Sequence, residues 1–140
     1  MSTYVVDASV VVKWFLEEAH TPEALGLLSN TNQLHAPDFL LVEVASVVCQ
    51  RIQRGQLLPE PGQQVLPALR LLPIQIAPTT DLLDSAVAIA MSTATSLYDS
   101  LYLALAALVE ARMVTADRRL FLKLLRGSFG DRVLWVGDLS

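Results

Sequence analysis

One carboxylate, Asp7, stands between two valine-rich runs in the stretch YVVDASVVVKWF, residues 4–15. Such runs belong in a protein interior, where an ionised carboxylate is seldom fully buried unless it is paired or bound to a metal ion. Lys13 is the only other charged residue of the stretch. Asp7 is therefore a candidate for an acid that does chemistry.

Three further acids occur in apolar surroundings. Glu43 lies in FLLVEVASVVCQRI, Asp99 in YDSLYLALAALVEA, and Asp117 in MVTADRRLF. Each has an ordinary alternative. Asp7 and Asp117 precede helical segments that an aspartate could cap, and Asp99 or Ser100 could cap a third. Glu43 could belong to a polar stripe facing water, whose other members at helical spacing are Ser46, Gln50 and Arg54.

The chemistry open to these acids depends on whether the fold brings them together. Up to four negative charges at short range would repel one another, and no matched group of lysines stands nearby in the sequence to neutralise them. A divalent cation would neutralise them, and a set of oxygen ligands suits Mg²⁺ or Mn²⁺. Zinc is disfavoured because His20 and His35 lack the spacing of zinc ligands and Cys49 stands alone.

Strands that alternate with helices are expected to position the acids. Short apolar or β-branched runs predict strands at Tyr4–Val6, Ile74–Ala77, Met113–Thr115 and Val133–Val136, with a weaker fifth at Leu34–Ala36. Helical periodicity predicts helices over 9–16, 21–29, 38–54, 61–72, 80–94, 99–111 and 117–126. Because the strands are apolar throughout, we predict an α/β protein with three α/β/α layers and a central, mainly parallel sheet of four or five strands. Chemistry in such a sheet gathers at the carboxyl ends of the strands, where Asp7 and Asp117 lie.

The length of 140 residues predicts a single domain over residues 1–140. The longest apolar run, Leu101–Val109, is about half the ~20 residues that a membrane-spanning helix requires. No basic region precedes the apolar N-terminal stretch, so a signal peptide is not expected. The single Cys49 excludes an internal disulfide and suits a reducing cytoplasm. We expect a cytoplasmic protein with no membrane partner.

Four motifs carry a resemblance to a known family. In their order and approximate spacing, VVDASVVVKW, LLVEVASVV, YDSLYLALA and VTADRRL resemble the acidic motifs of PIN-domain ribonucleases, and most closely those of the VapC-like toxins of toxin–antitoxin pairs. The resemblance runs from Tyr4 to about Trp135. It implies a PIN-like fold and a Mg²⁺- or Mn²⁺-dependent endoribonuclease that cleaves RNA with a metal-activated water. The catalytic, metal-binding acids that it implies are Asp7, Glu43, Asp99 and Asp117.

The same resemblance implies an RNA substrate, a cognate antitoxin protein and a homodimer. Two alternatives stay open: a catalytically weak PIN-fold module that binds RNA or protein, and an RNA-processing nuclease without an antitoxin. A phosphotransfer enzyme of the haloacid-dehalogenase type fits less well. It would need a second aspartate two residues after the first, where this chain has Ser9.

Smaller roles are expected for residues near the acids. Ser9 and Thr115 each stand two residues from an acid and could hydrogen-bond a carboxylate or a metal-bound water. Family members often carry asparagine three residues after the helical glutamate. This chain has Ser46 there, whose hydroxyl can still donate a hydrogen bond.

The net charge of −4 is unusual for a protein that binds a polyanion. Basic residues do follow Asp117, and Arg118 or Arg119 is expected to help hold the substrate. Aromatic residues could stack on unpaired bases, but at these spacings they are more typical of a core. The predicted site therefore leaves out Trp14, Phe15, Tyr98 and Tyr102.

Overall fold

A five-stranded sheet forms the centre of the computed structural model, which describes residues 2–139. Its strand order is β3-β2-β1-β4-β5, and every neighbouring pair is parallel. The strands are β1 (Ser2–Val6), β2 (Asn32–Pro37), β3 (Ile74–Ala77), β4 (Arg112–Thr115) and β5 (Val133–Trp135). This is the predicted α/β architecture with a parallel sheet.

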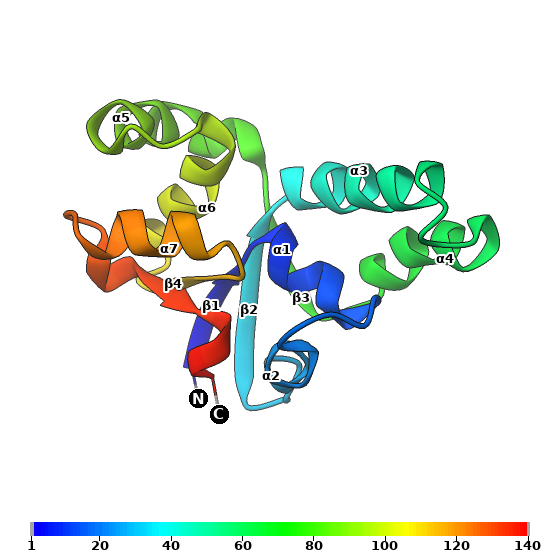
Figure 1. Cartoon of the computed structure of the whole chain (residues 1–140). Helices are drawn as coiled ribbons and strands as arrows, with labels where there is room; N and C mark the ends of the chain where they lie inside the picture. Colours follow the sequence, from blue (N-terminus) through cyan, green and yellow to red (C-terminus); the bar gives the residue numbers. More distant parts are fainter. Residues whose placement is uncertain (1, 140) are drawn as a thin grey trace.

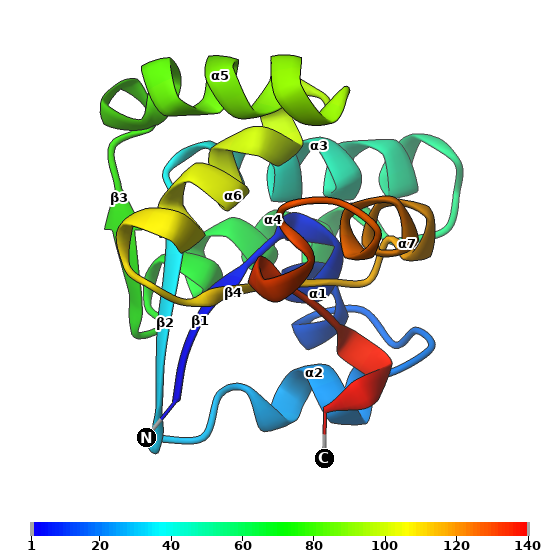
Figure 2. The same cartoon turned by 90° about the vertical axis from the view of Figure 1, so that its left-hand side faces the viewer.

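Helices cover both sides of the sheet, with α1–α4 on one side and α5–α7 on the other (Figure 1). Figure 2 shows α6 between α5 and the strands, and α6 contacts β1, β2 and β4. The helices are α1 (Ala8–Val11), α2 (Thr21–Gly26), α3 (Phe39–Gln53), α4 (Pro59–Arg70), α5 (Leu83–Thr93), α6 (Leu97–Leu108) and α7 (Arg118–Leu125). The three-layer prediction is confirmed.

The predicted segments are present with bounds that shift by a few residues, and two of them give way to 3₁₀ helices before their expected ends. The expected helix over 9–16 is shorter, because α1 gives way to a 3₁₀ helix at Val12–Trp14. Val136 does not belong to β5. Within residues 2–139, that edge strand pairs with β4 alone, and its register ends with Trp135 opposite Thr115, after which Val136 begins a 3₁₀ helix. The weaker fifth strand, expected at Leu34–Ala36, is present and longer.

Helix capping by Asp7 and Asp117 is confirmed, and the expected cap at Asp99 or Ser100 is wrong. Asp7 accepts a hydrogen bond from the N–H of Val10, and Asp117 caps α7 in the same way. Asp99 and Ser100 are not caps, because α6 begins two residues before Asp99. Its cap is Ser96, whose hydroxyl oxygen accepts a hydrogen bond from the N–H of Asp99. Capping and a place in a functional site are therefore compatible for Asp7 and Asp117.

The core explains why the sequence is so apolar. Val5, Val6 and Val114 are fully buried because helices cover both faces of their strands. In α6, every side chain from Ser100 to Ala106 is buried, since this helix lies beneath α5 and against the sheet. Within residues 2–139, no helix is both long and apolar enough to cross a membrane.

Truncation of a core side chain in α6 should destabilise the protein strongly. Leu103 is fully buried, so we expect Leu103→Ala to lower the free energy of unfolding by about 2–5 kcal/mol through lost contacts and a cavity. Leu71→Ala is the matched control, because Leu71 is 87% exposed and its loss should change stability by less than about 0.5 kcal/mol. Urea denaturation of the two variants measures both values. Equal losses would contradict the placement of α6.

Candidate functional site

The ends of two adjacent strands bring two of the predicted acids to one edge of the sheet. Asp7 directly follows β1, and Asp117 lies two residues beyond the end of β4. The two strands pair in parallel, with Val6 opposite Val114. Both acids therefore leave the sheet at its carboxyl edge, as the sequence predicts.

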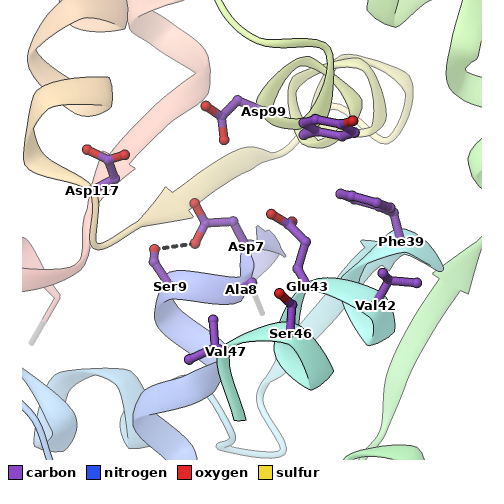
Figure 3. A pocket seen from close by; sticks show the side chains of 11 residues that line it. Asp7, Ala8, Ser9, Phe39, Val42, Glu43, Ser46, Val47, Asp99 and Asp117 are labelled. Carbon is purple, nitrogen blue, oxygen red and sulfur yellow. Dashed lines mark hydrogen bonds between the residues drawn. The ribbon is translucent and has the colours of Figure 1, made fainter. Parts of the chain in front are cut away.

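The other two acids reach the same place from helices on opposite sides of the sheet. Glu43 lies on α3 and Asp99 in the first turn of α6. The four predicted acids line one open cavity of about 440 Å³ (Figure 3). The remaining lining residues are Ala8, Ser9, Phe39, Val42, Ser46, Val47 and Tyr98. The structure thus gathers the four acids, although their role in catalysis stays a prediction.

Asp7 is the most buried of the four, with 6% of its surface exposed. The hydroxyl of Ser9 donates a hydrogen bond to the Asp7 carboxylate, and the backbone N–H of Val10 donates another. These two donors orient the carboxylate at the start of α1. Ser9 therefore occupies the predicted position beside an acid.

Ser9 also connects the two strand ends. Its hydroxyl oxygen accepts a hydrogen bond of 2.9 Å from the N–H of Ala116. Thr115 is fully buried, and its hydroxyl oxygen accepts a hydrogen bond of 3.0 Å from the N–H of Asp117. These contacts hold the loop after β4 against the loop after β1, so Ser9 and Thr115 fix the positions of two acids.

Tyr102 is a site residue that the sequence analysis left out. This side chain is 1% exposed, and its hydroxyl donates a hydrogen bond to the Glu43 carboxylate across the space between α6 and α3. Helical spacing could have indicated this residue, because Tyr102 is three residues from Asp99 and so lies on the same side of α6. Ser46 lines the cavity one helical turn after Glu43, and no hydrogen bond of its hydroxyl is found among residues 2–139.

Burial and mutual repulsion disfavour charge on three of the acids. Burial raises the pKa of Asp7 to about 7, with smaller contributions from Asp99 and Glu43 and against the opposing effect of its Ser9 and Thr115 hydrogen bonds. Burial likewise raises the pKa of Glu43, and Asp99 adds to it. The pKa of Asp99 is raised by burial and by Asp117, and lowered by its Ser96 hydrogen bond and by Lys123. The cavity is a place where positive charge would be stabilised.

Basic residues lie beside the cavity but do not line it. Arg118 places its guanidinium over the ring of Trp135, 5.2 Å from the ring centroid. Lys123, one turn further along α7, donates a hydrogen bond to the backbone oxygen of Ala94. Arg118 and Arg119 are both absent from the lining of the cavity. Contact between either arginine and a substrate stays a prediction.

The donor set has the chemistry that Mg²⁺ and Mn²⁺ bind in proteins. All four acidic side chains offer hard oxygen ligands. Mg²⁺ usually keeps several waters and binds to one or two carboxylates. Among residues 2–139, no group of three or more His, Cys, Asp or Glu side chains that could hold a metal ion is found.

The fold and the cavity define an α/β protein whose acids meet at the carboxyl edge of a parallel sheet. At this edge, the connections after neighbouring strands leave the sheet in opposite directions. A family model of the PIN domain matches residues 4–124. This match covers most of the chain, which therefore belongs to the PIN-domain family.

A named relative and several solved structures match this chain over most of its length. Ribonuclease VapC3 of Pyrobaculum aerophilum is 28% identical over 118 residues, which are 83% of this chain and 90% of that protein. The crystal structure of PAE2754 from Pyrobaculum aerophilum has a TM-score of 0.67 and 21% identity, and the match covers 87% of this chain and 79% of that one. A toxin–antitoxin complex from Klebsiella pneumoniae has a TM-score of 0.61 and 19% identity, with 94% and 95% covered. The two structural likenesses support the fold.

The stability of the metal-free protein should fall as the pH rises. The folded-state pKa of Asp7 is about 7 against an ordinary value of 3.8, so the folded state binds a proton that the unfolded state releases. We expect the free energy of unfolding in EDTA to decrease between pH 4 and pH 7, by at most about 4 kcal/mol from this residue. Denaturant unfolding over this pH range measures the change. Asp7→Asn should flatten the profile, and an equal slope in that variant would contradict the assignment.

Proposed function

We propose that this chain is a VapC-type endoribonuclease, a single PIN-like domain over residues 1–140 that cleaves RNA with Mg²⁺ or Mn²⁺ and acts as the toxin of a toxin–antitoxin pair. The observation that carries the proposal is the set of four acids from β1, β4, α3 and α6 that lines one cavity in a PIN-domain chain. The similarity to a named ribonuclease supports RNA as the substrate.

In the proposed mechanism, Asp7, Glu43, Asp99 and Asp117 would hold a divalent ion. That ion would supply a water of lowered pKa and would neutralise charge on the phosphate oxygens of the substrate. The chain's own residues prepare this site. Ser9 orients Asp7, Tyr102 orients Glu43, and the buried Thr115 fixes the backbone of Asp117.

The partners belong to the same proposal. The shared fold of the Klebsiella pneumoniae toxin–antitoxin complex supports a cognate antitoxin as partner. Exposed apolar side chains on α5 and at the end of α6 offer contact area for a homodimer; they include Val87, Met91 and Leu108. The free Cys49 fits a cytoplasmic protein.

A binding module without activity is the second candidate. Such a module would keep the fold but would not need four acids around one cavity. The raised pKa values of Asp7, Glu43 and Asp99 mean that ionising these acids lowers the stability of the folded state, which a module without activity would have no reason to retain. An RNA-processing nuclease without an antitoxin would share the same site. Co-purification with the product of an adjacent small gene would distinguish the proposed toxin, which has an antitoxin, from an RNA-processing nuclease, which has none.

RNA cleavage should depend on the metal and on the acids. Purified protein should cut a mixed pool of RNA in the presence of Mg²⁺ or Mn²⁺ and stop in EDTA. Asp99→Asn should reduce the rate by at least about a hundredfold, because it removes a ligand whose charge the proposed reaction needs. Asp84→Asn is the matched control, since Asp84 is exposed on α5 and does not line the cavity. Activity that survives both EDTA and Asp99→Asn would remove the proposed mechanism.

Loss of the Tyr102 hydroxyl should raise the Mg²⁺ concentration that cleavage requires, with a smaller effect on the stability of the fold. Tyr102→Phe keeps the buried ring and removes the donor to Glu43, so we expect the Mg²⁺ concentration for half-maximal cleavage to rise roughly 10- to 100-fold. Tyr4→Phe is a matched control, because Tyr4 lies in β1 away from the cavity. A Mg²⁺ titration of the cleavage rate measures the shift. The same midpoint in Tyr102→Phe and wild type would show that the hydroxyl does not position Glu43.

A further inference from the structure

The cavity that holds the four acids also has an aromatic, apolar end. Phe39 and Val42 line it at the end opposite Asp117, with Asp7 and Glu43 between them (Figure 3). Val42 is 60% exposed although it is aliphatic. The metal chemistry proposed above uses the acidic part of this cavity only. The aromatic end therefore has no role in that chemistry.

Phe39 and Tyr98 form a stacked pair at this end. Their ring centroids are 5.0 Å apart and the ring planes differ by only 12°. Tyr98 is 56% exposed, and none of the hydrogen bonds found within residues 2–139 involves its hydroxyl. Tyr98 is thus a large flat side chain in the lining of the cavity, parallel to a second ring on one side and half exposed to solvent.

The backbone that carries each ring is held by hydrogen bonds at the start of its helix. Phe39 is the first residue of α3, and its N–H donates a hydrogen bond of 3.1 Å to the Thr79 hydroxyl. Asp38 accepts hydrogen bonds from the N–H and hydroxyl of Thr79, which ties the start of α3 to the segment after β3. Tyr98 is in the first turn of α6 directly before Asp99, behind the Ser96 cap. The backbone at both ring-bearing residues is therefore fixed, and it places Tyr98 next to Asp99, a proposed metal ligand.

We infer that Phe39 and Tyr98 form a stacking platform for an unpaired nucleobase of the RNA, next to the phosphate that is cut. The inference rests on the proposed function, since it assigns the second half of the same cavity. The phosphate is the anionic part of a nucleotide and would lie at the acids with their cation. The base is flat and has apolar faces, which match a parallel aromatic pair better than the rounded side chains of a peptide do.

The composition of the platform also determines what it can recognise. Phe39 carries no polar side-chain group, and the Tyr98 hydroxyl lies in the plane of its own ring, so neither ring face reads the hydrogen-bonding edge of a base stacked on it. Aromatic stacking accepts every base because each has a π-face. The platform should therefore select RNA that is unpaired at this nucleotide, with little preference for which base it carries. Sequence preference would have to come from contacts outside this end of the cavity.

Removal of the Tyr98 ring should weaken RNA cleavage through binding. Tyr98→Ala is expected to raise KM for a single-stranded RNA roughly 5- to 100-fold with little change in kcat, the range for the loss of one stacked base. Tyr98→Phe keeps the ring and should stay within about twofold of wild type. Leu71→Ala is a control for loss of an exposed apolar side chain, because Leu71 is 87% exposed and outside the cavity. Thermal stabilisation by Mg²⁺ should be the same in Tyr98→Ala and wild type.

Modified substrates test the contact directly. An RNA with an abasic nucleotide beside the cleaved bond should be cut equally well by wild type and Tyr98→Ala, because it has no base to stack. A 2-aminopurine at that position should lose fluorescence on binding to wild type and keep it with Tyr98→Ala. This binding measurement stands apart from cleavage, so quenching without cleavage would support the platform and reject the nuclease.

Several results would overturn the platform. Cleavage by wild type that is unchanged in Tyr98→Ala, on intact and abasic RNA alike, would reject stacking while leaving the nuclease in place. Unchanged 2-aminopurine fluorescence, or an absence of RNA binding by wild type, would reject it as well. If Tyr98→Ala leaves RNA cleavage intact but weakens inhibition by a cognate antitoxin, the aromatic end would belong to a protein partner instead.

Discussion

The burial of several carboxylates around one cavity, together with their mutual repulsion, governs both the chemistry and the stability of this fold. Burial is the largest cause of the raised pKa values of Asp7, Glu43 and Asp99, and repulsion from neighbouring acids adds to it. Left alone, these acids would make the folded state less stable at neutral pH. The arrangement becomes favourable when a positive charge enters the cavity, which is why its chemistry and its stability are linked.

The topology of the sheet explains how four separate elements reach one place. From β1 the chain moves to β2 and then β3 on one side, while β4 and β5 lie on the other. The carboxyl end of β1 is therefore a switch point, where connections diverge and leave a crevice for a ligand. Helices α3 and α6 approach this crevice from opposite sides of the sheet and supply Glu43 and Asp99 (Figures 1 and 3). Hydroxyl groups of Ser9 and Tyr102 then fix individual carboxylates.

Much of this arrangement could be predicted from the sequence because it follows from local rules. Apolar strands between helical segments predict a parallel sheet, and its carboxyl edge places Asp7 and Asp117 together. Glu43 and Asp99 are different. Their helices pack on opposite sides of the sheet, and periodicity within one helix cannot say which side chains of two helices face the same cavity. Their inclusion depended on the resemblance to a family, and the cavity that they line agrees with it.

The residues that sequence analysis missed are those whose roles come from contacts between distant segments. The position of Tyr102 in an apolar helix is typical of a core residue, and its side chain is indeed buried. Its hydrogen bond to the Glu43 carboxylate arises because α3 brings Glu43 opposite its hydroxyl. The Phe39–Tyr98 pair likewise joins the starts of two helices. The start of α6 was placed too late because Asp99 resembles a cap, whereas Ser96 fills that position.

Anomalous X-ray diffraction from crystals soaked in Mn²⁺ determines whether the four carboxylates serve a shared cation. We expect an anomalous peak inside the cavity, with at least two of the four carboxylates bound to the ion directly or through one water. A cavity without manganese in a protein that cleaves RNA, or an ion held only by other residues, would show that the acids do not share a cation.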